Sequence, residues 1–259
     1  ENCLARQNPD GWFKEYRGAP DVSATGWYIQ ALKAAWMAGS TNPSLAESRK
    51  KAKAYLHKST FSEKGRITSF YYDYKTKVKG WGVMPAFKRK HPAVENIGLR
   101  AVGNLALVMS EDTKSKAYRD TAKIIVNHDL KYFKWLPMKK QPVAFPLYTW
   151  YYQTQAMFLK GGSSWSKWNK VFKKVITKAQ NRKGYWESPA EGSGLMRQWT
   201  KKEQRIYATA MCGLMLTVYY RYLPTSEKRK LTKGGGSTEL ISKKDLEGLL
   251  IESVNDTEI

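Results

Sequence analysis

The feature that most limits the fold of this 259-residue chain is an apolar segment that recurs four times, each time opening with Thr or Asn. The four segments are residues 25–38, 96–109, 149–159 and 209–222. After the opening residue each is apolar on most faces of a helix, which is typical of a helix buried all round. Recurrence at intervals of tens of residues is typical of repeat architectures. We therefore predict four inner helices.

The segments between the inner helices have an apolar stripe on one side only, as helices at a surface do. They are residues 44–58, 118–130 and 165–179. Ser44 and Glu47 have the spacing of a capping box, which begins a helix. The lysines of the last segment lie largely off its apolar face; they are Lys167, Lys170, Lys173, Lys174 and Lys178. We therefore predict outer helices that pack concentrically on the inner ones, with the last outer helix missing or degenerate.

Long connections and a change in composition suggest how the chain is divided. Residues 61–91 and 181–204 interrupt the helical pattern, and connections of this length are usually functional. After Pro224 the sequence becomes polar and passes through a Gly-Gly-Gly-Ser run. We predict a helical domain over residues 1–224, a flexible linker over 225–238 and an acidic amphipathic tail over 239–259.

The tail is predicted to form a short helix whose apolar residues dock on a partner surface. That surface belongs either to the same chain or to a neighbouring copy. The docking residues are Leu246, Leu249, Leu250 and Val254.

Several short motifs resemble the squalene cyclase and prenyltransferase repeat superfamily, over roughly residues 5 to 224. The sequence DVSATGW at 21–27 leads into IQALKAA, and Tyr151-Tyr152 is followed by QTQAMFLKGG and SSWSKWN. The ending TVYYRYLP is similar as well, and QNRKGYW at 180–186 is similar to the QW motif of that family. NPDGW at 8–12 resembles a degenerate copy of that motif. The resemblance implies an all-α fold, an α/α toroid that is partial or complete.

The chain departs from this family at the acidic motif on which cyclisation depends. In the squalene-hopene cyclases the corresponding strip reads Asp-x-Asp-Asp-Thr, and its middle Asp is the proton donor. Here the strip reads Asp21, Val22, Ser23, Ala24, Thr25. A serine hydroxyl is far too weak an acid to protonate an alkene. We therefore read Asp21 as the N-terminal cap of a helix.

The charge of the chain suggests its partners. The net charge is +23, from 45 Lys and Arg against 22 Asp and Glu. The segment from residue 234 onward has two Lys and six acidic residues, so it carries −4 and the rest of the chain +27. A surface so charged attracts polyanions such as nucleic acid, acidic glycans or an anionic envelope surface. Solubility conferred by surface lysines is the alternative explanation.

Two segments are candidate binding sites for an acidic polymer. The basic cluster before the second inner helix suits a phosphate, sulfate or carboxylate, and it consists of Lys88, Arg89, Lys90 and His91. An aromatic run interleaved with lysines can stack sugars or bases, or pack across the mouth of the toroid. Its candidate binding residues are Tyr72, Tyr74, Lys75, Lys77 and Trp81.

Two cysteines, three histidines and no CxxC spacing predict no zinc, haem or iron–sulfur site, and we expect no metal and no cofactor. In a toroid the last inner helix closes against the start of the chain, which would place Cys212 near Cys3. A disulfide and two free thiols both stay open. The chain begins at Glu1, so either a leader was removed or this end was trimmed. We expect a secreted, periplasmic or cell-surface protein without a membrane span.

Two functional hypotheses follow. The first is a secreted, non-catalytic toroid that binds a polyanionic partner or assembles with copies of itself through the tail. The second is an enzyme that uses the toroid cavity, either a lyase on acidic polysaccharide or an atypical terpenoid-type enzyme. The missing cyclase acid favours the first.

Overall fold

A computed structural model describes residues 2–13, 20–77, 97–137, 140–141, 143, 145–189 and 199–218. The chain divides into two units, Glu1–Val218 and Tyr219–Ile259, and every described residue belongs to the first. The predicted linker and tail therefore lie outside the described residues, as do the tail residues Leu246, Leu249, Leu250 and Val254.

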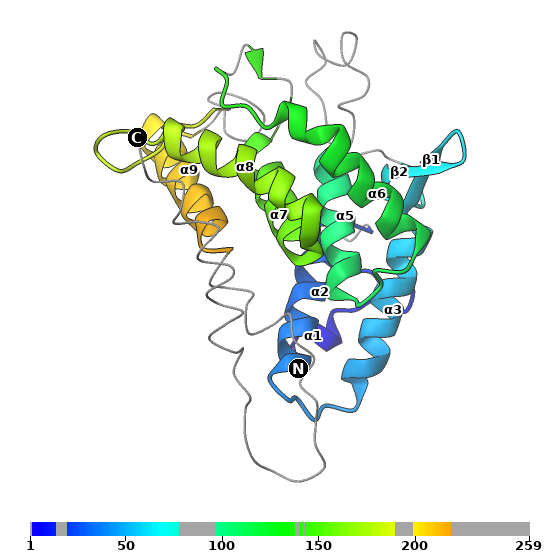
Figure 1. Ribbon diagram of the computed structural model, residues 1–259. Coiled ribbons are helices and arrows are strands. Elements are labelled where there is room, and N and C mark those ends of the chain that lie inside the picture. Colours follow the sequence, from blue (N-terminus) through cyan, green and yellow to red (C-terminus); the bar gives the residue numbers. More distant parts are fainter. Residues whose placement is uncertain are drawn as a thin grey trace, which may run out of the picture. The chain divides into compact units, whose positions relative to one another are not determined.

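The described part of the chain is mostly helical, in agreement with the predicted all-α class (Figure 1). The helices are α1 (Asn2–Ala5), α2 (Val22–Met37), α3 (Ser44–Lys58), α5 (Ile97–Met109), α6 (Lys116–Asn127), α7 (Pro146–Lys160), α8 (Gly162–Ala179) and α9 (Lys201–Leu216). A 3₁₀ turn, η2 (Asp129–Tyr132), follows α6. None of the helices within the described ranges is long and apolar enough to cross a membrane.

The helices pack in two layers. The inner helices contact one another in the order α2, α5, α7, α9. Each of the first three also contacts the outer helix that follows it in the chain: α3 packs on α2, α6 on α5 and α8 on α7. The predicted alternation of inner and outer helices is therefore present in the described residues. Closure of the inner row into a toroid stays a prediction.

Burial differs between the middle and the ends of the inner row. Nearly all side chains of α5 and most of those of α7 are buried, as predicted for inner helices. α2 and α9 are buried on one side only, so the prediction of burial all round is wrong for them. The exposed large apolar side chains of the described residues all lie on or beside these two helices: Trp27, Trp36, Trp199, Ile206 and Leu214. A helix at the end of a row has an inner neighbour on one side only, which explains the difference.

Helix starts depend on capping, and two predictions about them were wrong. α9 begins at Lys201, not near residue 209, because Thr200 and Glu203 form a capping box there. Ser44 and Glu47 form no such box. The N-cap of α3 is Pro43, and the backbone N–H of Ser44 donates to Asn42 Oδ1 at 2.9 Å.

A β-hairpin occupies part of the connection predicted over residues 61–91. Its strands β1 (Thr60–Glu63) and β2 (Arg66–Phe70) pair antiparallel and join at Lys64 and Gly65, both of which have positive φ. β2 packs on α5 and α6. The ring of Phe70 is fully buried against Gly103, where a Cβ atom would come within 2.2 Å of it. The hairpin therefore packs on both an inner and an outer helix. The helical pattern did not predict it.

Two turns far apart in the sequence share one hydrogen-bonding pattern. The side-chain amide of Gln7 donates to the carbonyl oxygen of Gly11 at 3.1 Å, and that of Gln180 donates to Gly184 at 3.0 Å. Both glycines have a positive φ, 92° and 87°, a conformation that glycine adopts without strain. These turns contain the NPDGW and QNRKGYW motifs, so the similarity between the two sequences reflects a structural repeat.

Each turn is anchored to an inner helix in the same way. The backbone N–H of Phe13 donates to Thr25 Oγ1 on α2 at 3.0 Å. The backbone N–H of Trp186 donates to Thr209 Oγ1 on α9 at 3.2 Å. α2 and α9 therefore occupy equivalent positions in the repeat, in agreement with the sequence match between segments 25–38 and 209–222.

A buried ion pair joins the middle of the inner row to the elements around it. Arg100 Nη1 on α5 lies 2.5 Å from Asp129 Oδ1 in η2, and both side chains are buried. Asp129 also accepts a hydrogen bond from Gln153 on α7 at 3.2 Å and contacts His128 Nδ1 at 3.0 Å. Arg100 Nε donates to the carbonyl oxygen of Thr68 in β2 at 2.5 Å. The network thus connects α5, α7, η2 and the hairpin.

Replacing Asp129 by Asn should destabilise the protein strongly, because it leaves the guanidinium of Arg100 buried without its counter-charge. Removing one partner of a buried pair typically costs about 3–5 kcal/mol. The measurement is the free energy of unfolding in urea. Glu187→Gln, which removes the carboxylate of the exposed Arg205–Glu187 pair, is the control and should have little effect. Equal, small changes in both variants would contradict this role for the buried pair.

Candidate functional site

The start of α2 carries a buried carboxylate with four hydrogen-bond donors around it. Asp21 Oδ1 accepts from the backbone N–H groups of Ser23 at 2.6 Å and Ala24 at 3.2 Å, and from the Ser23 hydroxyl at 2.6 Å. Asp21 Oδ2 accepts from the hydroxyl of Tyr72 at 2.8 Å. The backbone N–H of Val22 donates to the carbonyl oxygen of Tyr72 at 3.1 Å. Asp21 therefore fixes the segment after the hairpin to the N-terminus of α2.

The predicted role of Asp21 as an N-terminal cap is confirmed. Both of its oxygens accept hydrogen bonds, so the carboxylate completes the helix start rather than facing an open site. Ser23 lies at the position where the resemblance places the cyclase proton donor. Its hydroxyl donates a hydrogen bond to Asp21 Oδ1. These contacts give Asp21 a structural role, because they join the start of α2 to the segment after the hairpin.

The described part of the aromatic run also contacts the protein itself. The Tyr74 ring packs edge-on against Tyr55 at 5.6 Å, and its hydroxyl lies 3.5 Å from Asp10 Oδ2. Lys75 Nζ lies 3.4 Å from the same carboxylate, and Lys77 is exposed. Desolvation, followed by the negative charge of Asp10, raises the pKa of Tyr74. Tyr72 and Tyr74 are thus half-buried and held by carboxylates, while Lys75 and Lys77 remain at the surface.

The other predicted binding residues cannot be placed beside them. Lys88, Arg89, Lys90, His91 and Trp81 lie outside the described residues. Their contribution to a binding site stays a prediction.

Aromatic rings from α2 and α7 meet on the inner layer. Trp27 stacks on Tyr151 with ring centroids 6.3 Å apart and meets Tyr152 edge-on at 5.8 Å. Tyr148 lies 4.8 Å from Tyr152. On α9, desolvation and then the charge of Tyr148 raise the pKa of Tyr207. Tyr151 and Tyr152 are core residues, as their place on an inner helix predicted, whereas the half-exposed Trp27 could not be foreseen from the apolar pattern.

Cys212 is a free thiol that is fully buried on the inner side of α9, so the predicted disulfide with Cys3 is not formed in this structure. The face of α9 that carries Cys212 also carries Ala208 and Met215, and α9 packs on α7. Burial raises the pKa of the thiol, which makes it unreactive. The side chain of Cys3 lies outside the described residues.

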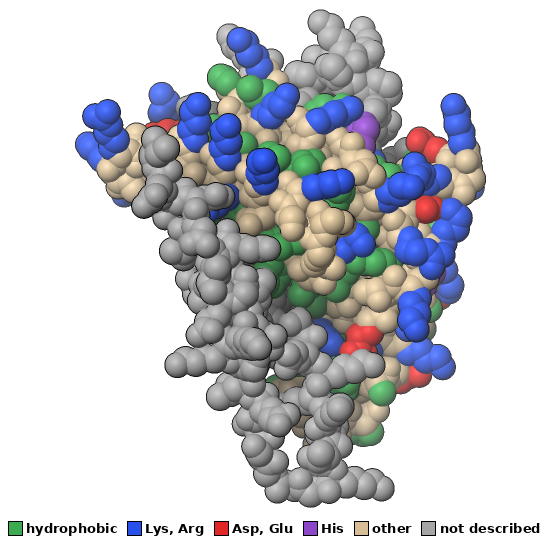
Figure 2. All heavy atoms as spheres, in the orientation of Figure 1, with side chains coloured by type: hydrophobic (Ala, Val, Ile, Leu, Met, Phe, Trp, Pro, Cys, Tyr) green, Lys and Arg blue, Asp and Glu red, His purple; other side chains and the backbone are tan. Residues whose placement is uncertain are grey.

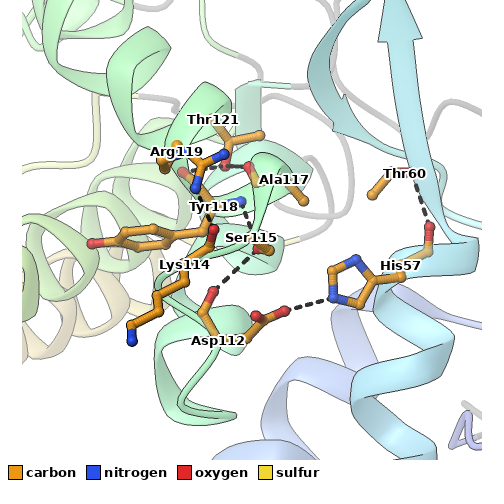
Figure 3. A network of polar contacts seen from close by, with 9 residues as sticks. All are labelled: His57, Thr60, Asp112, Lys114, Ser115, Ala117, Tyr118, Arg119 and Thr121. Carbon is orange, nitrogen blue, oxygen red and sulfur yellow. Dashed lines mark hydrogen bonds and ion pairs between the residues drawn. The ribbon is translucent and has the colours of Figure 1, made fainter.

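Across the ranges that the structure describes, no three side chains of His, Cys, Asp or Glu come together as a metal site. Most acidic side chains in those ranges form hydrogen bonds or ion pairs within the protein. His57 Nε2 on α3 lies 2.5 Å from Asp112 Oδ2 in the turn between α5 and α6 (Figure 3). Ser115 in the same turn accepts from the backbone N–H of Tyr118 at 3.2 Å, and so caps α6.

Glu111, the neighbour of Asp112, joins the same turn to the first helix pair. Its carboxylate lies 3.0 Å from Lys33 Nζ on α2 and 3.3 Å from Arg49 Nη2 on α3. Desolvation acts to raise the pKa of Glu111, but the hydrogen bonds and charges of Lys33 and Arg49 outweigh it, so the pKa is lowered. The turn between α5 and α6 thus uses both of its carboxylates to hold α2 and α3.

Lysines gather on the outer layer, where few acidic side chains lie near them. Figure 2 shows Lys and Arg side chains over the region that α8 occupies in Figure 1. The exposed lysines of α8 are Lys167, Lys170, Lys173, Lys174 and Lys178. Between Asp129 and Glu187 the sequence contains no acidic residue. Asp129 is buried with Arg100 and Glu187 is paired with Arg205, so neither of these carboxylates pairs with Lys167, Lys170, Lys174 or Lys178.

Comparison of the chain with protein-family models, with curated proteins and with solved structures gives no significant match.

Replacing Asp21 by Ala should destabilise the protein, since it removes the cap of α2 and the acceptor for the Tyr72 hydroxyl. Loss of an N-cap alone costs about 1–2 kcal/mol. Thermal and urea unfolding measure the change. Tyr72→Phe, which keeps the cap and removes one donor, is the matched control and should cost less. If Asp21→Ala unfolds like the unaltered protein, Asp21 is not a structural joint.

Proposed function

We propose that the protein is a non-catalytic α/α toroid, partial or complete, that binds polyanionic partners through its outer layer. The observation that carries this proposal is that the acidic and the basic side chains of the described residues differ in their contacts. Most carboxylates in the described residues are engaged in caps, turns and ion pairs, whereas Lys167, Lys170, Lys174 and Lys178 on the outer helix α8 are exposed and form no ion pair with a described carboxylate.

The acidic side chains that form such contacts are spread over the whole described chain. They are Asp10, Asp21, Asp73, Glu111, Asp112, Asp120, Asp129, Glu187 and Glu203. Because these charges are neutralised inside the fold or at its joints, the net charge of +23 is expressed mainly by exposed Lys and Arg. A potential of one sign attracts polyanions and raises their association rate.

The toroid part of the proposal rests on the repeat. The equivalent turns at Gln7 and Gln180, with their equivalent anchors on α2 and α9, support a ring of like units. The non-catalytic part rests on Asp21, whose oxygens both accept hydrogen bonds. A lyase on acidic polysaccharide and an atypical terpenoid-type enzyme are the enzymatic alternatives.

Binding of a polyanion should weaken steeply as salt is added, because each phosphate or sulfate neutralised by a Lys or Arg releases a counterion. For about six to ten contacts, affinity should fall by roughly 10³ to 10⁵ between 50 and 200 mM salt. Fluorescence anisotropy with labelled DNA duplexes and sulfated glycans measures it. Binding that is equally strong at both salt concentrations, or absent at the lower one, would refute the proposal.

Self-association is a second candidate function, favoured by the exposed apolar side chains on the two end helices of the inner row. Trp27 on α2 is 48% exposed, and Ile206 and Leu214 on α9 are 59% and 40% exposed. α2 and α9 are equivalent in the repeat, and each has inner-row contacts on one side only. Because Trp27 also packs on Tyr151 and Tyr152 of α7, the exposed side chains of α9 are the face on which a second copy can pack. A contribution of the tail to assembly stays a prediction.

Introducing charge on the α9 face should reduce such association. Sedimentation velocity in at least 200 mM salt, where self-repulsion is screened, should give a concentration-dependent mass for the unaltered chain. Ile206→Glu with Leu214→Glu should lower that mass. Lys201→Glu with Lys202→Glu changes charge at the start of the same helix and serves as the control. A monomer at every concentration would eliminate this second function.

A further inference from the structure

We propose that the exposed lysine row of α8 is the polyanion-binding site and that its ligand is the phosphodiester backbone of a duplex nucleic acid. The row is defined as Lys167, Lys170, Lys174 and Lys178. This inference rests on the proposed function, and it adds the surface and the class of ligand.

The helix geometry places the four lysines of the row in a line. Residues 167, 170, 174 and 178 fall within about 80° of the circumference of a helix that advances 100° per residue. The opposite side of α8 is fixed in the core by Trp168, Phe172 and Ile176, which are all fully buried. Because that side is packed, α8 cannot rotate, and the row faces solvent.

Two further exposed cations follow the end of α8. Arg182 and Lys183 are exposed in the repeated turn, at the positions that Pro9 and Asp10 occupy in its first copy. Lys183 is held by its backbone N–H, which donates to Asn181 Oδ1 at 2.9 Å. The first copy of the turn thus has Pro9 and Asp10 where the second has Arg182 and Lys183, so the two copies differ in charge.

The spacing of the row fits a backbone of phosphates. With a rise of about 1.5 Å per residue, successive lysines of the row are roughly 4.5, 6 and 6 Å apart along the axis. Phosphates of one duplex strand rise about 3.4 Å each along the axis while they wind around it, so the lysine spacings are of the same order as this repeat. The flexible lysine stem absorbs the difference, since its ammonium is a point charge without a fixed direction.

The surroundings of the row favour a duplex over a single strand or insertion into a lipid surface. Single strands are bound by aromatic platforms on which bases stack. The exposed large apolar and aromatic side chains of the described residues lie on or beside α2 and α9, and none is on α8. Insertion into a lipid surface requires exposed apolar residues as well. A duplex keeps its bases inside and presents a regular line of phosphates, which a row of lysines alone can bind without sequence preference.

No carboxylate within the described ranges pairs with the four lysines of the row. The nearest acids in sequence are Asp129, which is buried with Arg100, and Glu187, which is paired with Arg205. Binding of phosphates therefore breaks no ion pair of the row.

The test compares two variants with the same loss of charge. One carries Lys→Gln at positions 167, 170, 174 and 178, and the other carries Lys→Gln at positions 50, 51, 53 and 58 on the outer helix α3. Binding of each to a 30-base-pair DNA duplex is measured by fluorescence anisotropy from 50 to 200 mM salt. Circular dichroism melting checks that both variants fold.

The α8 variant should lose more than about tenfold in affinity, and the slope of log affinity against log salt should become shallower by about 3 to 4. The α3 variant should keep the slope of the unaltered protein within about 1. Equal losses in the two variants would show that only net charge matters and would overturn the assignment to α8. In that case salt-dependent binding by the unaltered protein would leave the proposed function standing.

Two further arms identify the class of ligand. A sulfated glycan, a single-stranded DNA of equal charge and vesicles containing anionic phospholipid replace the duplex. Weaker binding of all three, at equal salt, is the expected result. If any of them binds more tightly than the duplex and depends on the same four lysines, a nucleic-acid duplex is the wrong ligand. If the unaltered protein binds no polyanion at 50 mM salt, this inference and the proposed function fail together.

Discussion

Arg100 and Asp129 place two opposite charges in the buried interior, and the surrounding elements supply the hydrogen bonds that these charges require. A buried charge is tolerated only when it is paired and its remaining hydrogen-bonding capacity is used. Gln153 on α7, His128 at the end of α6 and the carbonyl oxygen of Thr68 in the hairpin supply those contacts. The relative placement of the inner row, the outer layer and the hairpin is therefore fixed around one pair.

The repeat explains why the helices in the middle of the inner row are more buried than those at its ends. α5 and α7 have inner-row contacts on both sides, so their side chains are buried nearly all round. α2 and α9 are equivalent by their turns and threonine anchors, but each has inner-row contacts on one side only. The apolar residues that a middle helix would bury remain exposed there. The exposed apolar side chains of α2 and α9 thus follow from the position of these helices in the row.

Acidic and basic side chains have largely different roles in this fold. The turn between α5 and α6 uses Glu111 and Asp112 to tie three helices together, and Asp21 joins α2 to the segment after the hairpin. With the carboxylates so employed, the basic residues of the outer helices dominate the surface. α8 is the extreme case, since its core side is aromatic and aliphatic and its solvent side is basic. Most of the carboxylates thus contribute to stability, whereas the four lysines of the α8 row contribute to the surface potential.

The sequence alone predicted the helical class, the alternation of inner and outer helices, the cap at Asp21 and the kinship of the two turns. These depend on local chemistry and on periodicity, which a sequence displays directly. It did not predict the hairpin, the true start of α9, the Arg100–Asp129 pair or the exposed faces of α2 and α9. Ion pairing and side-chain exposure depend on which element packs against each helix. The apolar pattern of a helix is the same whether or not another helix packs against it, so the sequence does not show the difference. Only the tertiary structure decided that α2 and α9 are exposed on one side and that Lys167, Lys170, Lys174 and Lys178 form an exposed row with no acidic partner among the described residues.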